Sequence, residues 1–306
     1  MKYLEAPVNI VRGFCMALLV FSSASYADGI INQPGSRLNL CGATNLAKTN
    51  ALLRNDFSNT LGMTGSQVDR QFEAGYPAGF PANYWGINTS NQAYVCLGVT
   101  SYSQSEWTFG SYSYQGAYSQ FSLTVLGFRV DSSGNREDVN GDGVVNDYDL
   151  VQMHWFSTFA AGNVTQSQDL YSAFTGAWNT QATTGTTQLS GGVYPNSVQA
   201  TKGDSALFSA SYVQSRLDSC LSGSVSAGRC KQWGSFSGSS YEIASEAATA
   251  PISIEFKHSG NRWLSYAAGD SYTLGDSGLA NLFQQIEFQP KFWVIAAASS
   301  FNYYLK

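Results

Sequence analysis

The chain contains one twelve-residue segment in which oxygen-bearing side chains alternate with other residues around a glycine. This segment, residues 138–149, reads Asp-Val-Asn-Gly-Asp-Gly-Val-Val-Asn-Asp-Tyr-Asp. Alternate side chains of a tight loop can converge on one point, and Ca²⁺ takes about six to eight oxygen ligands. Gly143 stands where the chain must turn sharply, so a Cβ there would be costly. The spacing predicts a calcium loop with these ligands: Asp138, Asn140, Asp142, the Val144 carbonyl, Asn146 and Asp149.

The pattern Asp-x-Asn-x-Asp-Gly-x-Val-Asn-x-x-Asp resembles the calcium repeat of dockerin type I domains, a branch of the EF-hand family. The resemblance covers about residues 136–160 and implies Ca²⁺ as the cofactor and a single helix after the loop, at 149–160. Asp149, rather than a longer Glu, closes the loop. Dockerins carry two such repeats and grip a cohesin partner with both helices. This chain has one repeat in mid-sequence, so cohesin binding is not expected.

The first 27 residues have the features of an export signal. Lys2 and Arg12 flank the start, and the apolar run Phe14–Phe21 is too short to span a bilayer. Small residues precede a cleavage point at Asp28. A prepilin-type cleavage after Gly13 is the alternative, although that site wants a glutamate where Leu18 stands. We expect a signal peptide at 1–27, a secreted protein at the cell surface or outside the cell, and no membrane span in the mature chain.

Four cysteines remain once the expected signal peptide is removed, and an even count in an exported chain predicts two disulfides. We favour Cys41–Cys96 and Cys220–Cys230, because the second pair closes a short loop. The net charge of −5 argues against a nucleic-acid partner. Charged residues make up only 12% of the chain, and a neutral, hydroxyl-rich surface leaves self-association or glycan binding open.

Hydrophobic periodicity predicts both helices and strands. The resulting fold class is α+β, a mainly antiparallel β-sheet with several packed helices and one EF-hand-like calcium loop. No boundary divides residues 28–306, which we expect to form one domain, and residues 180–200 fit a linker or a long surface hairpin. The expected helices are 44–61, 66–74, 149–160, 167–179, 204–222 and 277–286. The expected strands are 94–100, 121–130, 252–256, 263–266 and 292–297, with a hairpin turn at 259–261.

Residues 101–121 alternate serine with aromatic side chains over much of their length. On a strand, this alternation would place Tyr102, Tyr112 and Tyr114 on one face. Such a face would either pack inside a sheet or form an exposed surface for stacking on sugars or on a neighbouring subunit.

The signals for catalysis are weak. The two histidines, His154 on an expected helix and His258 at a strand end, lack the context of a general base. The Gly-Asp-Ser segments resemble nucleophile motifs of serine hydrolases, but their partner motifs are absent and helix N-capping explains them better. Paired carboxylates could act on glycans, yet the sequence alone does not bring two of them together. The available ones are Glu106, Glu242, Glu246 and Glu255.

These observations favour a secreted, calcium-binding, non-enzymatic surface or matrix protein for adhesion or assembly, such as a subunit of an extracellular filament, with a structural Ca²⁺. A carbohydrate-binding or polysaccharide-associated protein is the alternative, followed by a secreted glycoside hydrolase. An enzyme is the less favoured reading, and no catalytic residue is assigned.

Overall fold

The fold was analysed in a computed structural model of the chain. The structure describes residues 29–53, 72–76, 82–109, 112–131, 133–138, 142–146, 149–161, 183–184, 186–222, 230–232, 236–242, 253–258 and 262–305. The expected signal peptide and the expected helix at 167–179 lie outside these residues.

The larger sheet has eleven strands, and nearly all neighbouring strands in it are antiparallel. The exceptions are β5, which runs parallel to β11 and to β6. The strands of this sheet are β1 (Gly29–Asn45), β2 (Phe72–Ala74), β3 (Gln92–Phe109), β4 (Tyr112–Arg129), β5 (Leu150–Ala161), β6 (Thr183–Thr184), β10 (Cys230–Gln232), β11 (Phe236–Glu242), β12 (Ser253–His258), β13 (Arg262–Ser265) and β15 (Gln289–Leu305).

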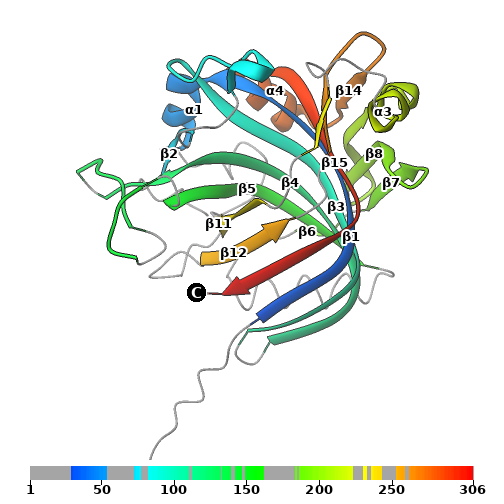
Figure 1. Cartoon of the computed structure of the whole chain (residues 1–306), viewed down its shortest axis with the longest axis horizontal. Coiled ribbons are helices and arrows are strands. Elements are labelled where there is room, and N and C mark those ends of the chain that lie inside the picture. The colour runs from blue at the N-terminus through cyan, green and yellow to red at the C-terminus, as the bar shows by residue number, and fades with distance from the viewer. Residues whose placement is uncertain are drawn as a thin grey trace, which may run out of the picture.

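The larger sheet closes on itself. Its strands follow the order β1-β3-β4-β5-β11-β12-β15, and β15 then pairs with β1. The closing ladder is long, because it runs from Gly29 opposite Tyr304 to Ala43 opposite Gln289. The sheet therefore has an inner and an outer face, and side chains along each strand alternate between them. Figure 1 shows β1, β3, β4 and β5 curving together, with β11 and β12 beside β5.

Strands β12 and β13 lie one after the other along the same edge of β15. His258 pairs with Phe301, and Arg262 pairs with Ile295. Both strands are antiparallel to β15, so they run in the same direction and do not pair with each other. Strands β12 and β13 therefore do not form the predicted hairpin, and its turn residues, 259–261, lie outside the described residues.

A smaller, four-stranded sheet packs on the outer face of the closed sheet, in the order β14-β9-β8-β7. Its strands are β7 (Thr187–Gly191), β8 (Pro195–Lys202), β9 (Ser205–Ser211) and β14 (Ser271–Leu274). One buried apolar cluster joins the two sheets, and the rings of Phe121 and Phe208 meet there at 5.6 Å. The β7–β8 pair confirms the hairpin expected within 180–200.

Three short α-helices and one 3-10 helix occur within the described ranges. They are α1 (Leu46–Leu53), α3 (Gln214–Leu221), α4 (Ser277–Gln285) and η1 (Ala82–Trp85). In Figure 1, α1, α3 and α4 gather along the same side of the molecule as β14. Helix α4 confirms the expected helix at 277–286, and Asp276 caps it by accepting a hydrogen bond from the Leu279 amide at 2.8 Å.

The predicted α+β architecture with several packed helices is wrong, because the described chain is mostly antiparallel β-sheet. The expected helix at 149–160 is strand β5, paired with β4 on one side and β11 on the other. The expected helix at 204–222 is strand β9 followed by the shorter α3. Residues 72–74 of the expected helix at 66–74 form β2, and the expected helix at 44–61 begins at Leu46, with only α1 described.

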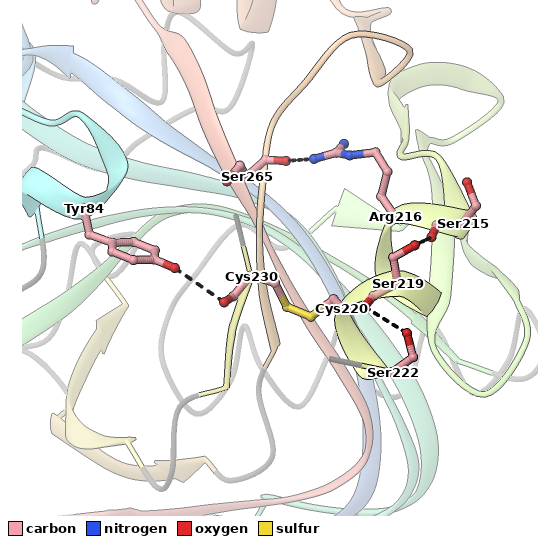
Figure 2. The surroundings of a disulfide bond; sticks show 8 residues. All are labelled: Tyr84, Ser215, Arg216, Ser219, Cys220, Ser222, Cys230 and Ser265. Atoms are coloured by element: carbon pink, nitrogen blue, oxygen red, sulfur yellow. Dashed lines mark hydrogen bonds between the residues drawn. A yellow bond between two sulfur atoms is a disulfide. The ribbon is translucent and has the colours of Figure 1, made fainter. Parts of the chain in front are cut away.

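Both expected disulfides are confirmed. Cys41–Cys96 joins paired positions on β1 and β3, so it ties two strands rather than a helix to a strand. Cys220–Cys230 fastens α3 to β10, and Figure 2 shows it below Arg216, which donates a hydrogen bond to the Ser265 carbonyl. The Tyr84 hydroxyl donates to the Cys230 carbonyl at 3.4 Å. This disulfide therefore connects α3 to β10, the strand that η1 contacts through Tyr84.

Candidate functional site

The loop between β4 and β5 folds its carboxylates back onto its own backbone. Asp138 accepts a hydrogen bond from the Gly143 amide at 2.7 Å, and Asp149 accepts one from the Asn146 amide at 2.7 Å. Gly143 has a φ of 85°, a left-handed conformation that favours glycine. Two of the expected ligand side chains, Asp138 and Asp149, thus accept hydrogen bonds from the backbone of the loop.

Strand β5 follows this loop, so the single helix expected after it is wrong. Asn140, one expected ligand, lies outside the described residues. Asp142 accepts from the Val144 amide at 2.8 Å, and the Asn146 side chain donates to the Val144 carbonyl at 2.9 Å. No group of three His, Cys, Asp or Glu side chains in the described part of the chain is arranged to hold a metal ion. The calcium, EF-hand and adhesion features expected from the sequence therefore have no support in this part of the structure.

The inner face of the closed sheet carries a buried cation. Arg37 on β1 is only 7% exposed, and its Nε donates to the Thr100 hydroxyl at 2.9 Å. Charged side chains are almost never buried this fully unless their charge has a use or a partner. Arg37 thus places a guanidinium, whose planar set of donors fits carboxylates and phosphates, on the inner face.

Asn39 and Trp85 also present polar atoms to the interior of the protein. Asn39 lies two residues along β1 from Arg37 and is 9% exposed, and its Oδ1 has no hydrogen-bond partner among the described residues. The same is true of Trp85 Nε1 on η1, whose ring packs against Phe292 at 4.5 Å. Buried polar atoms normally find partners, and unpaired ones point to a ligand, a water or strain.

Tyr94 shares this interior. Its hydroxyl donates to Cys41 Sγ at 3.4 Å. Burial raises the pKa of Tyr94, and the Arg37 charge offsets part of that rise. The positive charge of Arg37 on β1 therefore acts on Tyr94 of β3, which contacts the Cys41–Cys96 disulfide.

His154 is on a strand rather than on the expected helix. It pairs with Thr124 on β4 and with Glu242 on β11. Thr124 is a buried residue whose hydroxyl donates to the Cys96 carbonyl at 3.4 Å. Cys96 belongs to the buried cluster that also contains Trp85, Tyr94 and Phe292. Residues opposite one another in a sheet share a face, so the His154 and Glu242 positions belong to the inner face. Glu255 pairs with Ser239, three residues from Glu242, which places it on the other face.

Two of the three Gly-Asp-Ser segments do not cap helices. Asp270 is a fully buried partner of Arg216, and Asp204 stands in the exposed turn between β8 and β9. The third contains the Asp276 cap of α4. Helix capping is therefore confirmed only there.

A pocket of about 540 Å³ lies at the N-terminal end of α1. Asn45 and Glu287 are among its lining residues. Glu287 is in the left-handed region at φ 57° and accepts hydrogen bonds from Lys48 Nζ at 2.6 Å and from Asn45 Nδ2 at 3.1 Å. These bonds lower the pKa of the Glu287 carboxyl, the Lys48 bond most of all.

The aromatic segment 101–121 forms parts of two strands, β3 and β4, and not one. Tyr102 is 1% exposed and meets the ring of Tyr118 at 4.7 Å. For these two tyrosines the inward-packing alternative is confirmed. None of the helices among the described residues is long and apolar enough to cross a membrane.

No family model matches the sequence, and no curated protein matches it. Solved structures of similar shape exist. They include the enduracididine biosynthesis enzyme MppR complexed with pyruvate (TM-score 0.42, 8% identity, 93% of this chain and 91% of that one). An acetoacetate decarboxylase-like enzyme from Sphingomonas wittichii RW1 gives 0.42, with 11% identity and 91% of each chain covered. The acetoacetate decarboxylase of Legionella pneumophila gives 0.44, with 9% identity and coverage of 91% and 85%.

These neighbours are enzymes, and the comparison gives no support to the expected non-enzymatic calcium-binding matrix protein. We do not carry the matrix, adhesion and filament prediction or its glycan-directed alternatives further. Likenesses of this strength do not show what this chain itself binds or converts.

Proposed function

We propose that the protein binds a small anionic molecule on the inner face of its closed sheet, at Arg37. The single observation that carries the proposal is the burial of this guanidinium on the inner face. A guanidinium offers a planar fork of donors that fits a carboxylate or a phosphate. The surrounding aromatic and apolar side chains strengthen such a contact by excluding water.

The inner face favours a small ligand. Trp85, Tyr94 and Phe292 pack closely, with the Tyr94 and Phe292 rings 5.8 Å apart. A compact carboxylate such as acetate or pyruvate, or inorganic phosphate, is therefore the right probe class. The expected arrangement is a charge contact between the anion and the Arg37 guanidinium.

Calorimetric titration with acetate, pyruvate and phosphate tests the proposal. We expect the wild type to bind at least one of them, Arg37→Gln to lose at least about tenfold in affinity, and Arg37→Lys to lose less. Asn39→Asp adds a negative charge of nearly the same shape and should weaken binding as well. Arg136→Gln is the matched control, because Arg136 lies at the surface over the Phe128 ring.

Near-ultraviolet circular dichroism of each variant separates a lost ligand contact from a lost fold. Binding that is equal in wild type, Arg37→Gln and Asn39→Asp, all folded, would reject Arg37 as the anion site. Absence of binding by all three probes to the folded wild type would reject the proposal outright.

We also propose that the loop 138–149 binds Ca²⁺ when the ion is present. The donor set fits, since Asp138, Asp142 and Asp149 supply hard oxygen ligands and Gly143 adopts the required turn. When bound, the ion would brace the connection between β4 and β5, the strands that carry Thr124 and His154. The role is structural, and no helix is needed for it.

Thermal melting with and without Ca²⁺ and a chelator tests this second proposal. Ligand that binds only the folded state raises the melting temperature, and Asp142→Ala should abolish the response. Asp131→Ala is the control, because Asp131 organises the neighbouring turn by accepting from the Ser133 and Asn135 amides. A wild-type melt that is unchanged by millimolar Ca²⁺ would contradict calcium binding.

Export of the mature chain is a third proposal, and both disulfides support it. N-terminal sequencing of the protein recovered from the producing cells should begin at Asp28. Recovery of the chain with Met1 intact would refute removal of a leader.

A further inference from the structure

Three segments of the chain form the pocket at the N-terminal end of α1. They are the junction of β1 with α1, the turn before β3 and the turn between α4 and β15. Backbone hydrogen bonds hold them together, because the Asn45 amide donates to the Ile286 carbonyl at 2.8 Å and the Leu46 amide donates to the Asn91 carbonyl at 2.9 Å. The volume of about 540 Å³ is in the range of small-molecule sites.

The lining of this pocket is polar and nearly neutral. Five of its ten lining residues are asparagine or glutamine, and Glu287 alone among the ten has an acidic or basic side chain. The Glu287 carboxylate is paired with Lys48 Nζ at 2.6 Å. A charged ligand would therefore find no unpaired opposite charge in this lining, whereas a neutral polar ligand gives up less solvation on entering.

Asn50 brings a buried hydrogen-bond donor to the pocket. It is 9% exposed, and its Oδ1 accepts from the Ala74 amide at 2.8 Å. Because a backbone amide only donates, this bond fixes the orientation of the side-chain amide and leaves Nδ2 without a partner among the described residues. Polar groups buried this far are normally paired. Asn50 lines the pocket, so a ligand oxygen there would satisfy it.

The first turn of α1 supplies a second donor. The Leu46 amide is used by Asn91, and the Lys48 amide donates to Asn45 Oδ1 at 3.1 Å. The Ala47 amide between them has no partner within the described part of the chain, as is usual for the first turn of a helix. Ala47 and Asn50 are three residues apart, which makes them neighbours on the helix surface, and both line the pocket.

Glu287 supplies an acceptor to the same pocket. Its carboxylate accepts from Lys48 Nζ and from Asn45 Nδ2 at 3.1 Å, and a carboxylate has lone pairs for further donors. Glu287 holds this place at φ 57°, where glycine would be free of strain. Residues kept in such conformations cluster at functional sites.

We propose that this pocket binds a small neutral molecule through a carboxamide or lactam group. The ligand carbonyl accepts from Asn50 Nδ2 and the Ala47 amide, and the ligand N–H donates to the Glu287 carboxylate. A carboxamide carries this acceptor and donor side by side and has no charge. The inference does not rest on the anion site, because Arg37 precedes Asn45 by eight residues along β1, about 25 Å away.

Acetamide, acetate and acetamidinium are the probes, because they share one shape and differ in charge and donors. We expect saturation-transfer NMR titrations of the wild type to give an affinity for acetamide at least about fivefold above that for either ion. Arg37→Gln should leave acetamide binding unchanged. Loss of acetamide binding in Arg37→Gln would place the probe on the inner face and overturn the pocket assignment.

Asn50→Asp is the decisive variant. It keeps an oxygen for the Ala74 amide but replaces the Nδ2 donor with a carboxylate oxygen. Acetamide binding should weaken at least about fivefold and acetamidinium binding should strengthen, so that the order of the two probes reverses. Asn281→Asp makes the same change at an exposed position of α4 and should keep the wild-type order.

Ala47→Pro tests the second donor without changing any charge. Proline is tolerated in the first turn of a helix and has no N–H, so acetamide should bind about threefold or more weakly while near-ultraviolet circular dichroism stays that of the wild type. A merely structural role for Asn50 would not reverse the order of the probes. Absence of acetamide binding to the folded wild type, equal affinity for the three probes, or an unchanged order in folded Asn50→Asp would each overturn the proposal.

Discussion

Arg216 and Asp270 form an ion pair that joins α3 to the turn after β13. Arg216 Nη1 lies 2.7 Å and 2.5 Å from the two carboxylate oxygens, and the Asp270 side chain is completely buried while that of Arg216 is 22% exposed. Asp270 also accepts from Trp293 Nε1 at 2.9 Å and from the Ala267 amide at 3.0 Å. A single carboxylate thus links a helix, a turn and the closing strand β15.

Replacing this carboxylate should destabilise the fold strongly. Asp270→Asn keeps the shape but removes the charge that Arg216 needs, and breaking a buried pair costs about 3 kcal/mol or more. Chemical denaturation should report this loss as a lower midpoint with an unchanged slope. Asp218→Asn, at an exposed carboxylate that accepts a hydrogen bond from Gln214 Nε2 at 2.9 Å, should change the midpoint little. Equal effects of the two variants would contradict the assignment.

Alkaline pH should unfold the protein through its buried tyrosines. Burial raises the pKa of Tyr94, and burial followed by the charges of Asp218 and Asp270 raises that of Tyr212. The folded state therefore holds protons that the unfolded chain releases near pH ~10. This contribution to stability is fully present below that pH and is lost as the pH rises above it.

Tyr94→Phe provides the test for the alkaline transition. The variant has no phenol to ionise at this position, so its free energy of unfolding should decline less steeply above pH ~10. Denaturant melts at several pH values measure the slope. Parallel decline in wild type and variant would show that Tyr94 does not contribute.

Glu287 occupies a position where glycine is the usual residue. It follows α4 at φ 57°, and the Phe288 amide donates to the Phe283 carbonyl at 3.0 Å, which is the bond pattern of a left-handed helix end. Glu287→Gly relieves the strained backbone but, like Glu287→Ala, loses the bonds to Lys48 and Asn45, so it should melt at a higher temperature than Glu287→Ala. Glu287→Ala keeps the strain and loses the bonds to Lys48 and Asn45, so it should lower the melting temperature; the reverse order would contradict this account.

Gly98 has no room for a side chain. A Cβ there would lie 2.2 Å from the Leu38 carbonyl oxygen and 2.6 Å from Asn39 Oδ1. Gly98→Ala should therefore destabilise the β1–β3 pairing by about 1–3 kcal/mol or more and disturb the Asn39 side chain. Gly192→Ala is the control, since nothing lies within 4 Å of its Cβ, and its melting curve should match the wild type.

Sequence periodicity identified elements whose burial pattern is local. The five expected strands each overlap an observed strand, and α4 was found because Leu279, Leu282 and Phe283 make a buried stripe with an Asp276 cap. The two disulfides were also found. The short separation between Cys220 and Cys230 is visible in the sequence. The Cys41–Cys96 disulfide depends instead on the pairing of β1 with β3.

Sequence reasoning failed where long-range pairing overrode a local pattern. The β5 segment was assigned to a helix because a dockerin-like loop precedes it, yet β-branched and aromatic residues suit a strand that is paired on both sides. Residues 204–222 carry apolar residues at helical spacing, but their first half pairs with β8 and β14. Those partners are not visible in a short window of sequence.

The inner-face site had one local signal that was missed. Leu38 and Leu40 alternate with Arg37, Asn39 and Cys41, a period-two pattern typical of a strand. Strand β1 was not predicted at all, so Arg37 was not considered. The neighbourhood of His154 and Glu242 has no local signal, because it depends on the register of β5 against β11.

The β1–β15 ladder has a consequence for the order of assembly. It pairs Gly29 with Tyr304, so the larger sheet cannot close until β15 has left the ribosome. Until then β1 and β12 each expose an open edge that invites pairing with other chains. Nascent chains halted before residue 289 should therefore depend on chaperones more than the finished protein does.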